Sequence, residues 1–137
     1  MAQHIGLVSI VVRDYDEALH FFVNILGFQL VEDKPVPEQA KRWVVVRPPS
    51  SNGGGILLAR AANETQAIRV GNQTGGRVSF FLYTDDFKRD FELYTARGVE
   101  FVRGPTEEAY GTVAVFKDLY GNLWDLLEPS PNTGAAQ

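Results

Sequence analysis

The chain repeats one pattern of residues, and this repeat limits the folds that are open to it. Residues Val8–Val31 read VSIVVRDYDEALHFFVNILGFQLV, and residues Val78–Val102 read VSFFLYTDDFKRDFELYTARGVEFV. Each copy has Val-Ser and an apolar run, an Asp followed by an aromatic residue, an amphipathic stretch, a Gly and a short alternating segment. A period of about 70 residues is longer than the repeats of solenoid proteins. The pattern therefore predicts two copies of one supersecondary unit.

The first copy opens a module with the order β-α-β-β-β. Asp14 is a good N-cap for a helix, and Gly27 supplies the conformation that ends one. Two prolines indicate that Lys34–Ala40 is a loop, because proline cannot donate to a strand ladder. The β-branched and alternating segments give the expected strands, which are Ile5–Val12, Phe28–Glu32, Arg42–Arg47 and Gly55–Arg60.

The second copy opens a module of the same kind. Asp86 is expected to cap its helix and Gly98 to end it, and Asp118–Gly121 has the composition of a turn. The expected strands are Arg77–Thr84, Val99–Val102, Thr112–Phe116 and Asn122–Leu127. The predicted organisation is thus module 1–60, a polar linker 61–76 with a helical turn around Glu64–Val70, and module 77–129.

Strand alternation divides the residues of each module between two faces. The even-numbered residues are expected to pack under the helices; they are Val8, Ile10, Val12, Val78, Phe80 and Leu82. The opposite faces are still partly apolar and are unfavourable in water. We therefore predict an α+β protein in which two curved mixed sheets surround a shared cavity, where a small ligand would bind.

Composition narrows the range of partners and compartments. The net charge is -4 and the sequence has no basic cluster, which argues against a nucleic acid or an anionic membrane surface as partner. The absence of cysteine excludes disulfides and thiolate chemistry. No apolar run approaches the roughly 18 residues of a membrane span, and the N-terminus lacks secretory features. The expected location is the cytoplasm.

Several short sequence motifs together resemble those of a known superfamily. They are Asp14-Tyr15-Asp16-Glu17-Ala18, Phe21-Phe22, Leu26-Gly27-Phe28 and the segment Asp118–Leu126, DLYGNLWDL. In this order, and with the internal duplication, the chain resembles the vicinal-oxygen-chelate superfamily. That group contains glyoxalase I, fosfomycin-resistance proteins, extradiol dioxygenases and bleomycin-resistance proteins. The resemblance covers Ile5–Pro129 and implies paired βαβββ modules and a homodimer.

The resemblance also implies where a metal would bind. Enzymes of this superfamily hold one divalent ion with His and Glu side chains from four strands, because the ion must hold two substrate oxygens and stabilise negative charge. In this sequence those four positions fall on Leu7, Leu57, Ser79 and Asp125. One carboxylate alone is not a transition-metal site. We therefore expect neither a metal nor another cofactor.

The candidate site follows from the residues expected to face the cavity. The predicted ligand-binding residues are Ser9, Trp43, Arg77, Ser79, Phe81, Tyr83, Tyr110 and Asp125. Asp125 is the candidate catalytic group, since burial in an apolar cavity would raise its pKa. The alternative interpretation is a carboxylate that pairs with Arg77 or with another cation of the cavity. Trp124 alternates with Asp125 and is expected in the core under the second helix.

Three functions are compatible with these residues. The preferred interpretation is a binder of a small organic molecule that is partly aromatic or apolar and is held without a metal, as in bleomycin-resistance proteins. The alternative is a divergent lyase, isomerase or dioxygenase-type enzyme, which either uses a metal or employs Asp125 as base. A third possibility is an interaction module that keeps only the fold.

Overall fold

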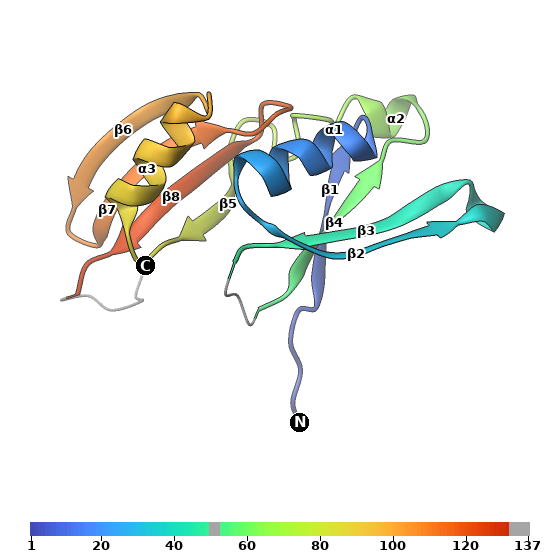
Figure 1. Ribbon diagram of the computed structural model, residues 1–137, viewed down its shortest axis with the longest axis horizontal. Coiled ribbons are helices and arrows are strands. Elements are labelled where there is room, and N and C mark those ends of the chain that lie inside the picture. The colour runs from blue at the N-terminus through green and yellow to red at the C-terminus, as the bar shows by residue number, and fades with distance from the viewer. Residues whose placement is uncertain (50–52, 132–137) are drawn as a thin grey trace. The chain divides into compact units, whose positions relative to one another are not determined.

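A computed structural model describes residues 1–49 and 53–131 of the chain. The chain divides into two compact units, Met1–Gln73 and Thr74–Gln137. Each unit has a four-stranded mixed sheet and one principal helical segment (Figure 1). The predicted α+β fold of two βαβββ modules is confirmed. Within the described residues, no helix has the length and apolar character that a bilayer span requires.

The first unit has its strands in the order β1-β4-β3-β2, with β1 and β4 parallel and the other pairs antiparallel. Its elements are β1 (Leu7–Val12), α1 (Tyr15–Leu19), a π-helix (His20–Ile25), β2 (Gln29–Val36), a 3-10 turn (Pro37–Gln39), β3 (Lys41–Arg47), β4 (Gly55–Arg60) and α2 (Glu64–Ala67). As predicted, Asp14 caps the helix, and its carboxylate accepts a hydrogen bond from the Glu17 N–H at 2.9 Å.

The core of the first unit lies between its sheet and the helical segment that begins at α1. Its fully buried side chains come from β1, β3, β4 and that segment; they are Ile10, Val12, Ala18, Phe22, Val44, Val46 and Leu58. The predicted alternation is confirmed for Ile10 and Val12. It is wrong for Val8, which is 44% exposed near the start of β1.

The predicted loop at Lys34–Ala40 is wrong for its first three residues, because β2 continues to Val36; the remainder is a 3-10 turn that ends at Ala40. Pro35 pairs with Arg42 in the antiparallel β2–β3 ladder. Strand β2 lies at the edge of the sheet, where a residue without an N–H need not interrupt the hydrogen bonds to the one neighbouring strand. The position of β2 at the edge of the sheet therefore allows Pro35 within a strand, although its presence in the sequence had indicated a loop.

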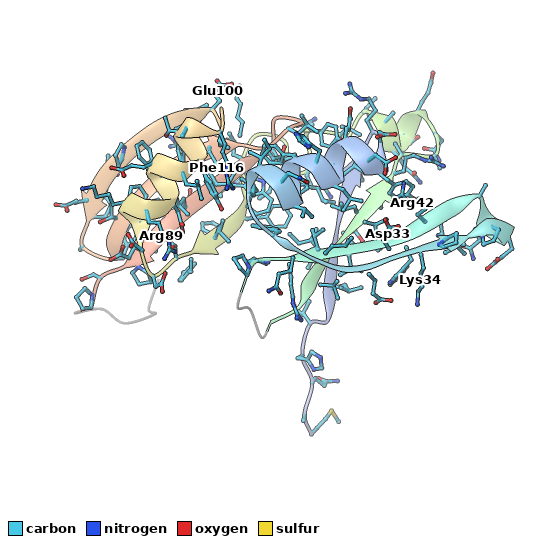
Figure 2. All side chains as sticks on the ribbon, viewed as in Figure 1. Asp33, Lys34, Arg42, Arg89, Glu100 and Phe116 are labelled. Atoms are coloured by element: carbon cyan, nitrogen blue, oxygen red, sulfur yellow. The ribbon has the colours of Figure 1, made fainter. Side chains whose placement is uncertain are left out.

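Arg42 connects this edge hairpin to α1. Its guanidinium lies 2.7 Å from the Asp33 carboxylate on β2 and 2.9 Å from that of Asp16 on α1; Figure 2 labels Asp33 and Arg42 on the hairpin. These hydrogen bonds raise the pKa of Arg42. The guanidinium groups of Arg42 and Arg60 each lie 5.1 Å from the centre of the buried Tyr15 ring. The ion pairs and ring contacts hold the hairpin against the helix.

The second unit has the strand order β5-β8-β7-β6, with β5 and β8 parallel. Its elements are β5 (Val78–Tyr83), α3 (Phe87–Ala96), β6 (Phe101–Glu108), β7 (Gly111–Lys117) and β8 (Leu123–Pro129). In Figure 1, α3 lies along one face of this sheet. Strand β6 differs from the expected Val99–Val102, because Val99 is buried at the end of the helix and the strand continues to Glu108.

Aromatic rings form the core of the second unit. The Phe80 and Trp124 rings stack with their centres 4.3 Å apart, and Phe116 lies 5.8 Å from Trp124 and 5.7 Å from Phe101. Trp124 is 2% exposed, which confirms its predicted core position. Burying rings of this size supplies much of the apolar contribution to stability.

The predicted turn at Asp118–Gly121 is built around one buried carboxylate. Asp118 Oδ1 accepts hydrogen bonds from the backbone N–H groups of Tyr120, Gly121 and Asn122, each at 3.0 Å. Its Oδ2 accepts from Asn122 Nδ2 and from Trp124 Nε1, each at 3.1 Å. The carboxylate therefore fixes the β7–β8 connection and anchors the core tryptophan.

Candidate ligand-binding site

The face of the second sheet opposite α3, here called the open face, carries the candidate site. Trp124 packs in the core, so its neighbour Asp125 projects to the open face. Strand pairing places Asp125 beside Val115 on β7 and Phe81 on β5, and Val115 beside Arg103 on β6. One row across all four strands therefore carries Arg103, Val115, Asp125 and Phe81.

A pocket of about 410 Å³ lies on this face. It is lined by Val78, Arg103, Gly104, Thr106, Glu108, Tyr110, Val113, Ala114, Val115 and Asp125. Val113 and Val115 are 8% and 7% exposed. The pocket combines apolar surface with a few polar groups, as small-molecule sites do.

Asp125 is a partly buried acidic residue of the pocket lining. Partial burial raises its pKa, in the direction that the sequence predicted, and the charge of Arg103 opposes this shift. Within the described residues, no hydrogen bond or ion pair engages the Asp125 carboxylate. The carboxylate is therefore available to a ligand.

The structure brings two of the predicted site residues, Tyr110 and Asp125, together in the pocket. Phe81 and Tyr83, 60% and 44% exposed, follow on the open face of β5. Of the two cations left open for Asp125, Arg77 precedes β5 and is exposed, whereas Arg103 lines the pocket and its charge acts on Asp125.

Sequence reasoning missed Arg103, Thr106 and Glu108. Strand β6 has irregular pairing on both sides of Arg103, between Phe101 and Arg103 and between Arg103 and Thr106. Such irregularities change the direction in which side chains point. They also break the alternation that is used to assign each residue to one face of the sheet. The only signal in the sequence was the Gly104-Pro105 pair, which marks a strand interruption without giving its register.

Another irregularity changes the start of β5. Val78 pairs with Leu123 and Phe80 with Trp124, so Ser79 is the extra residue of a bulge. The predicted packing of Val78 under the helix is therefore wrong, because Val78 lines the pocket. The Ser79 hydroxyl lies 3.4 Å from that of Thr74, and Ser79 is absent from the pocket lining.

The other predicted residues belong to the first unit. Ser9 pairs with Leu57 in the parallel β1–β4 ladder, which places both on one face. Trp43 pairs with Lys34 and is half-buried, and the Lys34 ammonium lies 3.1 Å from Glu32. Their participation in a site stays a prediction.

The residues at the four metal positions do not fit a metal ion. Leu7 and Leu57 offer only aliphatic carbon, on the face of the first sheet opposite Ile10 and Val12, and Ser79 occupies the bulge. Across residues 1–49 and 53–131, no group of three or more His, Cys, Asp or Glu side chains is placed to hold a metal. Asp125 would be a single ligand at most.

The paired βαβββ units and the pocket on an open sheet face define a glyoxalase-like protein. The family model of the Glyoxalase/Bleomycin resistance protein/Dioxygenase superfamily matches residues 3–126, and the chain belongs to this superfamily.

Individual relatives agree with this assignment. An uncharacterized protein of Shewanella frigidimarina is 59% identical over 93% of this chain and 95% of its own length. Among solved structures, UcmS2 superposes with a TM-score of 0.80 at 28% identity, covering 93% of this chain and 98% of its own. TnmS3, an antibiotic binding protein from Streptomyces sp. CB03234, gives a TM-score of 0.76 at 30% identity, with 94% of this chain and 98% of its own covered.

Proposed function

We propose that this protein binds a small, partly aromatic or apolar organic molecule without a metal ion, and that it acts by sequestration. The observation that carries the proposal is the pocket on the open face of the second unit, where the Asp125 carboxylate makes no hydrogen bond or ion pair with residues 1–49 and 53–131. Such a site can bind a ligand and orient it, but it has no Lewis acid among its own residues. The similarity to TnmS3, an antibiotic binding protein, supports the same class of function.

Thermal unfolding with a panel of aromatic antibiotics tests this proposal. A ligand at 100 times its Kd should stabilise the protein by about 2.7 kcal/mol. Asp125→Ala should remove that shift, whereas Glu107→Ala, on β6 of the same sheet but outside the pocket lining, should retain it. Absence of any shift across the panel would favour the interaction module over the binder.

Metal analysis of the purified protein tests the second half of the proposal. Three of the four metal-ligand positions that the family resemblance implies carry Leu7, Leu57 and Ser79. We therefore expect less than one equivalent of zinc, nickel, manganese or iron per chain. One equivalent of any of these ions, retained through dialysis, would overturn the metal-free assignment.

A second candidate function is catalysis with Asp125 as general base. The raised pKa of Asp125 favours it, because a base works best when its pKa approaches the working pH. A lyase or isomerase would convert a bound ligand, so mass spectrometry after prolonged incubation separates the two functions. Recovery of unchanged ligand supports sequestration.

We further expect a cytoplasmic homodimer, from the family resemblance and the composition. Light scattering coupled to size-exclusion chromatography measures the mass. A mass near that of a single 15.2 kDa chain would contradict the dimer.

A further inference from the structure

We propose that the pocket of the second unit selects ligands that carry an ammonium group on an aromatic or apolar body, with Asp125 as the counter-ion. This inference rests on the proposed function and specifies the chemical class of its ligand. The proposal begins from a carboxylate that faces a pocket and has no hydrogen-bond donor or ion-pair partner in the described residues. A partly buried carboxylate is most strongly stabilised by a charged donor that reaches it directly.

The charges around the pocket favour a cation. Two carboxylates, Asp125 and Glu108, line it together with one guanidinium, that of Arg103, so the lining carries a net charge of -1 when all three are ionised. Arg103 and Asp125 lie two strands apart in one row, about 10 Å between backbones from the usual strand spacing. Arg103 therefore acts on Asp125 through its charge without occupying it.

The neighbouring surface suits the rest of such a ligand. Val113 and Val115 give an apolar surface beside the carboxylate. On the other side of Asp125 in the same row is Phe81, whose side chain is 60% exposed. A cation held at Asp125 lies beside an aromatic ring, which attracts it further, and the ligand body covers apolar surface.

Each of the other three strands carries ionisable groups on the open face that holds Asp125. They are Tyr83 on β5, Arg103 and Glu108 on β6, Tyr110 in the β6–β7 turn, and Lys117 on β7. The Lys117 ammonium lies 3.9 Å from the Glu100 carboxylate and does not line the pocket. Asp125 therefore remains the partly buried carboxylate that a ligand cation can reach.

Three probes with one ring system test the proposal: 2-naphthylmethylamine, 2-naphthylmethanol and 2-naphthoate. Isothermal titration calorimetry on the full chain at pH 7.5, with the amine protonated, gives each Kd. A charge-assisted hydrogen bond should make the amine bind about tenfold more tightly than the alcohol. The naphthoate should bind more weakly than the alcohol, because Asp125 and Glu108 repel it.

Two variants locate the effect. Asp125→Asn keeps the shape but removes the charge, so it should abolish the preference for the amine over the alcohol. Glu107→Gln removes a carboxylate that does not line the pocket and should keep the preference. In the unmodified protein, the amine should bind more weakly as the pH falls and Asp125 gains a proton, while binding of the alcohol stays level.

The outcomes separate this inference from the function on which it rests. Equal binding of amine and alcohol, or tightest binding of the naphthoate, would overturn the ammonium specificity and leave the binding function intact. Failure of all three probes to bind at millimolar concentration would overturn both. A preference for the amine that persists in Asp125→Asn would also refute the role of Asp125.

Discussion

Replacing Asp118 should destabilise the second unit more than any surface substitution of similar size. The Asp118 carboxylate accepts five hydrogen bonds, and two of its partners, Asn122 and Trp124, are 3% and 2% exposed. Water can replace the carboxylate at the half-buried Tyr120 N–H, but less readily at the donors on the two buried residues.

The expected magnitude follows from these buried donors. Each buried donor left without a partner costs about 1–3 kcal/mol. With the Asn122 N–H, Asn122 Nδ2 and Trp124 Nε1 affected, we expect Asp118→Ala to lower the free energy of unfolding by about 4 kcal/mol, allowing for relaxation. Asp118→Asn keeps one acceptor oxygen but sets its NH₂ group against other donors, so its loss should be about 2 kcal/mol.

Urea unfolding followed by fluorescence measures this loss. The chain has two tryptophans, so a Trp43→Phe background leaves Trp124 as the sole indole reporter, beside the altered site. Asp85→Asn is the matched control, since its side chain is 88% exposed and pairs only with Arg89 among the described ion pairs; it should cost less than about 1 kcal/mol. If Asp118→Ala lost no more than this control, the argument from buried donors would be refuted.

Three further predictions concern other parts of the chain. Gly104→Ala should lower the free energy of unfolding by about 2–4 kcal/mol in urea, because Gly104 has φ of +87° and an added Cβ would lie 2.8 Å from the Val113 carbonyl oxygen. Asp125→Asn should be more stable than the parent at neutral pH and equally stable in acid. The folded-state pKa of Asp125 is raised, so the parent loses free energy of unfolding when this carboxyl ionises as the pH rises. Urea midpoints measured over a pH series test this. Arg42→Gln should cost about 1 kcal/mol through its ion pair with Asp33 (28% exposed), and the loss should shrink in 1 M NaCl.

The sequence predicted the architecture because the signals that define it are local and occur twice. Asp14 and Asp86 cap their helices through the hydrogen bonds that the sequence suggested, and Trp124 lies in the core as alternation required. The extension of β2 beyond Glu32 was not predicted, because proline is unfavourable only where an N–H must pair, and the sequence does not reveal which strand lies at the edge.

The candidate site was less predictable, because it depends on register. Asp125 and Tyr110 were anticipated, and the direction of the Asp125 pKa shift follows from burial. Arg103 and Val78 were not, since both adjoin irregular pairing that changes which face a residue joins. Alternation cannot locate a bulge, and one misplaced residue reverses the face of everything beyond it.

The bulge at Ser79 also bears on how readily such a protein can change its chemistry in evolution. Its register shift separates Val78 and Phe80 by one residue more than Leu123 and Trp124, at the position where the family resemblance implies a histidine ligand. A histidine substituted there would start from a backbone whose pairing is already displaced. Uninterrupted β5–β8 pairing at this position would need the deletion of one residue as well as a change of side chain.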